Sequence, residues 1–177
     1  MKRSFPVALC LALAFVMEGC SQGIHSATGG WPPASPTVPA GISSSADVVK
    51  VRSADVSIPA GGNADATVTL SISPRYHINA NPATFPYLIP TAVNPGKSEG
   101  IIAGSPVYPA GQKKKFQFAE EPLAVYEGAV QIKMPLRVAT NITGPGRLPI
   151  SVTVQACDHE KCYAPATLDA TITVNVK

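Results

Sequence analysis

Apolar and polar residues alternate in four separate stretches of the chain. Residues 66–73 read Ala-Thr-Val-Thr-Leu-Ser-Ile-Ser, so every second side chain is polar. The same alternation occurs in three further stretches, residues 130–134, 148–154 and 170–176. Successive side chains of a β-strand point to opposite faces, so this period of two predicts strands. Val68, Leu70 and Ile72 are therefore expected to face a hydrophobic core.

Helices are expected to be nearly absent. No stretch of about 12 residues shows a helical stripe, and the 18 prolines of the chain would interrupt a helix wherever it began. Short strands that recur about every ten residues, with turn sequences at 94–96 and 144–146, are typical of a two-sheet β-protein. We therefore predict an all-β, immunoglobulin-like antiparallel β-sandwich over residues 47–177. A Cys-Trp-Cys arrangement is absent from the sequence, which excludes an antibody-type domain.

Residues 1–19 are typical of a secretory signal peptide. Two basic residues precede an uncharged, mostly apolar run over residues 4–17, which is too short for a permanent membrane span. The small residue before Cys20 resembles the lipobox of bacterial lipoproteins and predicts that Cys20 is lipid-modified. Met17 and Glu18 depart from the usual pattern of such a signal. The alternative is ordinary cleavage near this point, with Cys20 free or removed.

Residues 20–46 have the composition of a flexible tether. Ser, Gly, Pro, Ala and Thr dominate the segment, and it contains no Asp, Glu, Lys or Arg. Such a segment cannot bury enough apolar surface to fold by itself. As a flexible coil it would span about 30 Å, enough to hold a domain away from a membrane surface.

Length and charge limit the possible classes of protein further. A chain of 177 residues is long enough for one globular core and too short for two ordinary domains with linkers. Its net charge of +3 falls to about +2 when the signal peptide, with two basic residues and one acidic residue, is removed. That charge is far below the basic excess that nucleic-acid binding requires. No phosphate-binding glycine loop, nucleophile elbow or zinc-protease motif is present.

Cys157 and Cys162 are the only cysteines after the tether, and four polar residues separate them. An exported protein meets oxidising conditions, in which such a pair persists as a disulfide if the chain reverses between the two residues. Three interpretations remain open from the residues alone: a structural staple, a redox couple, or a metal site with His159 as a third ligand. His159 and Lys161 would favour a neighbouring thiolate, and the two acidic residues of the loop would oppose it.

Residues 153–165 resemble the active-site sequence of the N-terminal periplasmic domain of the disulfide reductase DsbD. They read Thr-Val-Gln-Ala-Cys, four residues, then Cys-Tyr-Ala-Pro. Residues 76–82 and 125–128 are similar to further segments of that domain, so the resemblance covers most of residues 47–177. It implies an immunoglobulin-like sandwich whose cysteine pair passes electrons between thioredoxin-like periplasmic proteins and a membrane electron donor. No flavin, nicotinamide or metal is implied.

The resemblance also implies roles for single residues. Cys162 matches the family's cysteine that forms the mixed disulfide with a partner, and Cys157 matches the cysteine that resolves it. In the family a loop with an aromatic cap covers the active site. Phe118 is the better candidate for this cap and Phe116 the next, and we expect both on one face of a strand. A plain core position is the alternative for either phenylalanine.

We therefore predict a thiol:disulfide interchange domain on the periplasmic side of the cell envelope, tethered through Cys20. Cys157 and Cys162 are the predicted catalytic residues. Four side chains are expected around them: Tyr76, Phe118, His159 and Tyr163. The alternative function is a non-catalytic envelope lipoprotein that binds another protein and keeps the disulfide as a staple.

Overall fold

Four long strands carry most of the hydrophobic core. The computed structural model describes residues 41–177, so the predicted signal peptide and most of the predicted tether lie outside it. Each long strand contains one stretch of predicted alternation: β3 (Asn63–Ile72), β9 (Ala129–Val138), β10 (Gly144–Val154) and β12 (Ala166–Val176). In β3, Val68 and Leu70 are fully buried, whereas the threonines beside them are partly exposed. The predicted strands are confirmed and extend further than the alternation alone indicated.

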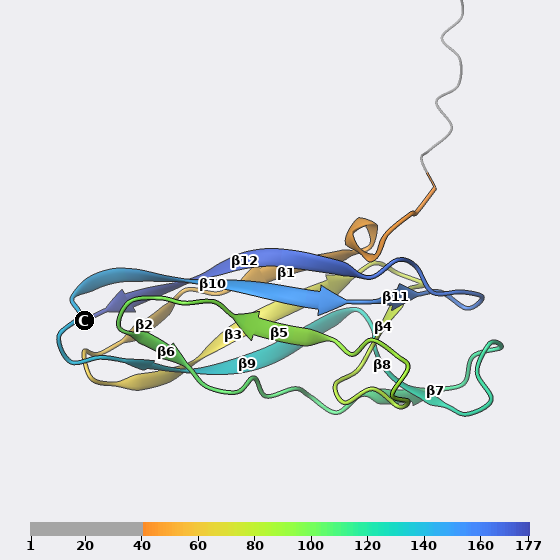
Figure 1. Cartoon of the computed structure of the whole chain (residues 1–177), viewed down its shortest axis with the longest axis horizontal. Helices are drawn as coiled ribbons and strands as arrows, with labels where there is room; N and C mark the ends of the chain where they lie inside the picture. Colours follow the sequence, from red (N-terminus) through yellow and green to blue (C-terminus); the bar gives the residue numbers. More distant parts are fainter. Residues whose placement is uncertain (1–40) are drawn as a thin grey trace, which may run out of the picture. The chain divides into compact units, whose positions relative to one another are not determined.

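The strands form three sheets of four strands each (Figure 1). The orders are β1-β3-β9-β6, β2-β12-β10-β5 and β11-β4-β8-β7. All pairings are antiparallel except the one between β2 and β12. The short strands are β1 (Val49–Ser53), β2 (Val56–Ile58), β4 (His77–Asn79), β5 (Ala92–Pro95), β6 (Ile101–Ala103), β7 (Gln112–Lys114), β8 (Leu123–Tyr126) and β11 (Ala156–Cys157).

The first two sheets pack together over a common core. Leu70 and Ile132 of the first sheet belong to the same buried cluster as Leu148 and Ile172 of the second sheet, and none of these side chains is exposed. Removing such apolar surface from water is the main stabilising contribution in a sandwich of this kind. The predicted all-β, immunoglobulin-like sandwich is therefore confirmed.

Two sequences that were predicted as turns lie mostly within strands. Asn94 and Pro95 end β5, an edge strand of its sheet, where a proline does not need to donate a ladder hydrogen bond. Residues 144–146 begin β10, which pairs with β12 there and meets β5 only at residues 150–153. The turn prediction was wrong because proline and glycine are tolerated where a strand lacks a neighbour on one side.

A single 3₁₀ turn, Ser45–Asp47, is the only helical segment among residues 41–177. Ser44 caps the turn, and the Asp47 carboxylate accepts a hydrogen bond from the Ser44 backbone in return. Ser45 is fully buried, although composition alone assigned it to the tether. The folded domain thus includes Ser44 and Ser45. In this described part of the chain, no helix is long and apolar enough to cross a membrane.

The third sheet occupies one end of the sandwich. Figure 1 shows β11, β4, β8 and β7 at this end and the C-terminus at the opposite end. β11 follows directly from β10, so the long central strand leads into the short strand that carries Cys157. The cysteine pair is therefore placed at the end of a rigid scaffold.

Candidate functional site

The two cysteines are joined where β11 ends. Cys157 lies directly opposite His77 of β4 in the antiparallel register. The chain then reverses over four residues, so that Cys162 pairs with Cys157 and the Tyr163 N–H donates to the Ala156 carbonyl at 2.8 Å. The disulfide has an S–S distance of 2.02 Å and a Cα–Cα distance of 3.9 Å. The reversal that the spacing required is present.

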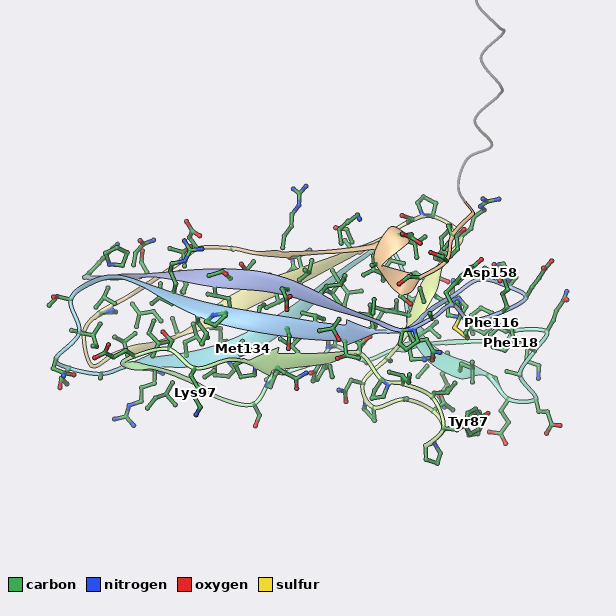
Figure 2. All side chains as sticks on the ribbon, turned by 45° about the horizontal axis from the view of Figure 1, so that its top comes forward. Tyr87, Lys97, Phe116, Phe118, Met134 and Asp158 are labelled. Atoms are coloured by element: carbon green, nitrogen blue, oxygen red, sulfur yellow. A yellow bond between two sulfur atoms is a disulfide. The ribbon has the colours of Figure 1, made fainter. Side chains whose placement is uncertain are left out.

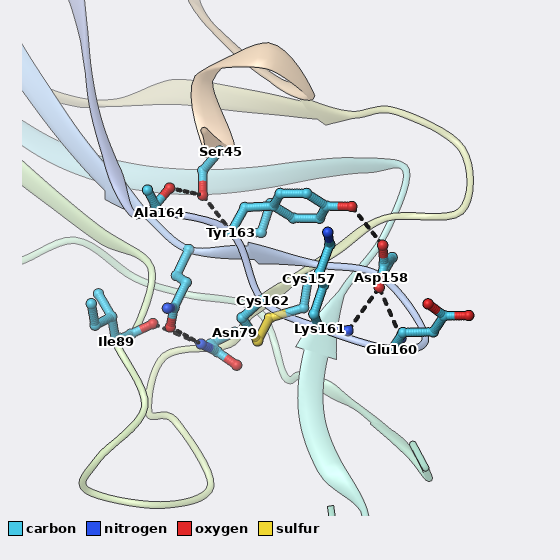
Figure 3. Close-up of a disulfide and its surroundings, with 12 residues drawn as sticks. Ser45, Asn79, Ile89, Cys157, Asp158, Glu160, Lys161, Cys162, Tyr163 and Ala164 are labelled. Atoms are coloured by element: carbon cyan, nitrogen blue, oxygen red, sulfur yellow. Dashed lines mark hydrogen bonds between the residues drawn. A yellow bond between two sulfur atoms is a disulfide. The ribbon is translucent and has the colours of Figure 1, made fainter. Parts of the chain in front are cut away.

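Asp158 organises the loop between the cysteines. Its carboxylate accepts hydrogen bonds from the backbone N–H groups of Glu160 and Lys161, both at 2.8 Å, and from the Tyr163 hydroxyl at 2.6 Å (Figure 3). These hydrogen bonds, above all the one from Tyr163, lower the pKa of Asp158 to about 2. The same hydrogen bond raises the pKa of Tyr163 to about 12. The loop therefore carries an ionised Asp158 and a neutral Tyr163 at neutral pH.

The two halves of the disulfide differ in exposure. Cys157 is buried, with 1% of its surface exposed, whereas Cys162 is an exposed residue. Thiol–disulfide exchange requires that an external sulfur reach one sulfur of the bond in line with the other. This arrangement offers Cys162 to an incoming protein and keeps Cys157 covered by the domain.

Ser45 ties together the two chain segments that flank the disulfide loop. Its hydroxyl donates to the Ala164 carbonyl at 2.7 Å and accepts the Ala156 N–H at 2.8 Å (Figure 3). Its own backbone N–H also donates to the Ala164 carbonyl, at 2.9 Å. Because Ala156 precedes Cys157 and Ala164 follows Cys162, Ser45 fixes the base of the loop. Sequence reasoning missed this residue because it lies in a low-complexity segment.

Phenylalanines from the loop between β7 and β8 lie beside the disulfide end (Figure 2). Phe116 is 3% exposed and stacks on His77, with ring centroids 4.0 Å apart. Phe118 stacks on Phe116 at 5.5 Å and is 40% exposed. The expectation that both share a strand face was wrong: residues 115–122 form a loop, and stacking between rings brings them together. The role of Phe118 as a cap stays a prediction.

The other predicted site residues lie around the cysteine loop. His159 is exposed, and its ring centroid lies 5.9 Å from that of Phe116. The ring of Tyr76 meets Tyr163 edge to face at 5.8 Å, and the Lys161 ammonium lies 5.4 Å from the Tyr163 ring centroid. The fold thus brings together Tyr76 and Tyr163, which are 87 positions apart in the sequence.

His77 also belongs to the site, although the sequence analysis did not assign it there. It is 2% exposed, and burial lowers its pKa to about 4. On one side it lines a cleft of about 320 Å³ together with Tyr76, Lys114, Glu127 and His159. Lys114 and Glu127 form an ion pair there. The Tyr76-His77 sequence within the DsbD-like segment was the only local signal that could have pointed to it.

The metal-site interpretation gains no support from the described residues. Among residues 41–177, no three His, Cys, Asp or Glu side chains are grouped so that they could hold a metal ion. The His159 ring lies 5.9 Å from the Phe116 ring, and Cys157 and Cys162 are joined to each other. A tetrahedral site would require four ligands around one point.

The fold and the site together define a class of protein: an immunoglobulin-like sandwich domain with an unequally exposed disulfide at one end. Among known protein families, the one described as "Thiol:disulfide interchange protein DsbD, N-terminal" matches residues 45–173, well over half of the chain. The chain therefore belongs to the family of DsbD N-terminal domains. This family membership supports thiol:disulfide interchange as its general activity.

Two solved structures of N-terminal domains are similar to the chain. The N-terminal domain of DsbD from Neisseria meningitidis, in its reduced form, is 20% identical over 66% of this chain and 82% of that one, with a TM-score of 0.44. The N-terminal periplasmic domain of ScsB from Proteus mirabilis is 14% identical over 73% of this chain and 47% of that one, with a TM-score of 0.47. No curated protein sequence matches the chain.

Proposed function

We propose that this domain passes electrons between thioredoxin-like proteins on the periplasmic side of the cell envelope, through the Cys157–Cys162 couple. The observation that carries the proposal is the unequal exposure of the two cysteines, 1% for Cys157 against an exposed Cys162. A purely structural disulfide does not need one accessible half. Membership of the DsbD N-terminal family agrees with the same chemistry.

The proposed reaction has two exchange steps. In the first, the Cys162 thiolate of the reduced domain attacks a partner disulfide, which forms a Cys162–partner bond and releases one partner thiolate. In the second, Cys157 attacks Cys162, which closes the Cys157–Cys162 bond and releases the other partner sulfur as a thiol. Two electrons move from the domain to the partner, and the reverse sequence reduces the domain. The hydrogen bonds of Ser45 hold both flanks of the loop in place during the exchange.

Single cysteine variants test this division of roles. A Cys162→Ser variant is expected to lose electron transfer to a thioredoxin-like partner completely. A Cys157→Ser variant is expected to accumulate a covalent mixed disulfide with the partner, visible on a non-reducing gel and by mass spectrometry. A mixed disulfide that forms through Cys157 in the Cys162→Ser variant would contradict the assignment.

The reduction potential separates this function from the alternative of a binding module with a structural staple. Equilibration with glutathione or dithiothreitol buffers, followed by trapping of free thiols, gives the potential of the couple. A value of roughly −120 to −270 mV, within the range of thioredoxin-like proteins, supports electron exchange. A value below about −300 mV would favour the staple.

We further propose that Cys20, which lies outside the described residues, carries a lipid that anchors the protein to the membrane. Support comes from the small residue before Cys20 and from the apolar run that precedes it. Mass spectrometry of the membrane fraction should find a mature chain that begins with a diacylglycerol-modified Cys20. A mature chain that begins elsewhere without a lipid would exclude this anchor.

A further inference from the structure

Two buried polar atoms stand out on the strand next to the disulfide. Among the described residues, His77 Nε2 and Asn79 Oδ1 are the buried side-chain nitrogen and oxygen atoms without a hydrogen-bond partner. Both residues belong to the three-residue strand β4. Buried polar atoms are nearly always paired, so two unpaired atoms on one short strand call for an explanation.

The register of the sheet places these residues beside Cys157. His77 lies directly opposite Cys157, and side chains of directly opposed residues in an antiparallel pair project from the same face as near neighbours. Asn79 is two positions along β4, so it projects from that face as well, diagonally to Cys157. Ile78, between them, projects to the opposite face and joins the main core. One face of β4 therefore carries these two polar residues next to Cys157.

The redox state of the cysteines changes which hydrogen-bond donors lie near these residues. A disulfide has no S–H group and cannot donate a hydrogen bond, whereas reduction creates two thiol donors. We propose that His77 accepts the proton of the reduced Cys157 thiol and thereby prepares Cys157 for its attack on the mixed disulfide. This inference rests on the proposed exchange function and assigns a further residue to it. Asn79 Oδ1 is a second acceptor on the same face for the reduced dithiol.

With His77 as the proton acceptor, protons and electrons balance in the resolving step. The Cys157 sulfur gives its proton to the imidazole and its electron pair to a new bond with Cys162. The bond from Cys162 to the partner breaks, and the partner sulfur leaves with that electron pair and takes up the proton from His77. Nothing beyond the domain and the bound partner is consumed.

The surroundings of His77 keep the imidazole in its neutral, accepting form. Burial lowers its pKa to about 4, and electrostatic interactions with His159 and Lys114 act in the same direction. Glu127 and Asp158 act in the opposite direction, and the stacked Phe116 ring adds no charge. At neutral pH the imidazole is therefore uncharged, and the ring nitrogen that lacks a proton can accept a hydrogen bond from the thiol.

The test separates the two exchange steps in time. The full chain, with Cys10→Ser and Cys20→Ser substitutions so that only Cys157 and Cys162 carry thiols, is reduced. It is then mixed in a stopped-flow instrument with one equivalent of 5,5′-dithiobis(2-nitrobenzoate). The first coloured thiolate reports the attack by Cys162, and the second reports resolution by Cys157. The second rate is measured across pH in the parent chain, in His77→Phe, which keeps an aromatic ring against Phe116, and in His77→Gln.

Both His77 variants are expected to resolve at least about tenfold more slowly at neutral pH, with an unchanged first step. Their second rate should rise about tenfold per pH unit as the Cys157 thiol ionises without a base, whereas the parent rate should be nearly flat. Parental rates and pH profiles in both variants would overturn the role of His77. A parent chain that shows no second phase would instead refute the proposed function itself.

A measurement on the unsubstituted His77 remains informative if the His77 variants fail to fold. The ¹⁵N resonance of His77 Nε2 is expected to shift on reduction, because the nitrogen gains a hydrogen bond from the Cys157 thiol. In Cys157→Ala, which lacks the donor, the Nε2 resonance under reducing conditions should match that of the oxidised parent chain. An Nε2 resonance that is the same in the oxidised and reduced chains would overturn the proposal.

Discussion

Reduction of the Cys157–Cys162 bond is expected to lower the free energy of unfolding by only about 2 kcal/mol. The two cysteines are five positions apart, so the bond closes a very short loop. In the chain-entropy description, the stabilisation by a disulfide grows with the logarithm of the loop length, and a loop of this size gives about 2 kcal/mol. A small domain has a total stability of about 5–15 kcal/mol, so the reduced domain should remain folded.

The structure supports this small value because the core does not depend on the bond. The core residues of β3, β9, β10 and β12 lie between the two main sheets, and the disulfide lies at the end of the third sheet. The Ser45 hydrogen bonds hold both flanks of the loop independently of the sulfur atoms. Reduction should therefore release the four residues between the cysteines and little else.

Urea unfolding followed by far-ultraviolet circular dichroism measures this difference. The chain with Cys10→Ser and Cys20→Ser is unfolded with and without dithiothreitol. The two free energies of unfolding are compared, with the same dependence on urea concentration (m-value) used for both. The matched control is the same chain with Cys157→Ser and Cys162→Ser added, on which dithiothreitol should have no effect. A loss above about 4 kcal/mol, or unfolding on reduction alone, would refute the reasoning and support the structural staple.

Substitutions at other positions should have distinct effects. Ser45→Ala leaves the buried Ala156 N–H without a partner and should lower the unfolding free energy in urea by about 1–3 kcal/mol. Phe116→Ala should cost about 3 kcal/mol, whereas Phe118→Ala, at a partly exposed position, should cost less than about 1 kcal/mol and speed the alkylation of reduced Cys162. His77 has a pKa of about 4 in the folded domain against 6.5 ordinarily. The unfolded chain therefore binds a proton first, so stability is complete above pH 6.5 and falls towards pH 4. In His77→Phe, thermal melts should lose most of this dependence.

The main sandwich could be predicted because its strands are long and buried on one face only. In β3 the side chains of Val68, Leu70 and Ile72 face the core and the residues between them do not, so the sequence alternates visibly. The cysteine pair could be predicted for a similar reason, since the four intervening residues fix a tight reversal. Local patterns of this kind survive in the sequence because each depends on neighbours only a few positions away.

The third sheet was not predictable in the same way. All three residues of β4 are buried, because Ile78 faces the main core while His77 and Asn79 face the disulfide end. A strand of three residues is too short for alternation to be recognised in the sequence. Its pairing with β11 joins positions almost 80 residues apart, which no local pattern encodes. The same holds for Ser45, whose partners Ala156 and Ala164 lie more than 100 positions away.

The hydrogen bonds of Ser45 also have a mechanical consequence. Ile42 is the first described residue that packs against the core, and the first hydrogen bonds that the chain makes to distant segments are those of Ser45 to Ala156 and Ala164, on the two sides of the disulfide loop. Force applied to the chain ahead of Ser45 would therefore act on the hydrogen bonds at the base of this loop before it acts on the long strands of the sandwich. Tension along that segment would strain the base of the loop that carries Cys157 and Cys162, so the disulfide end of the domain is expected to respond to force before the long strands do.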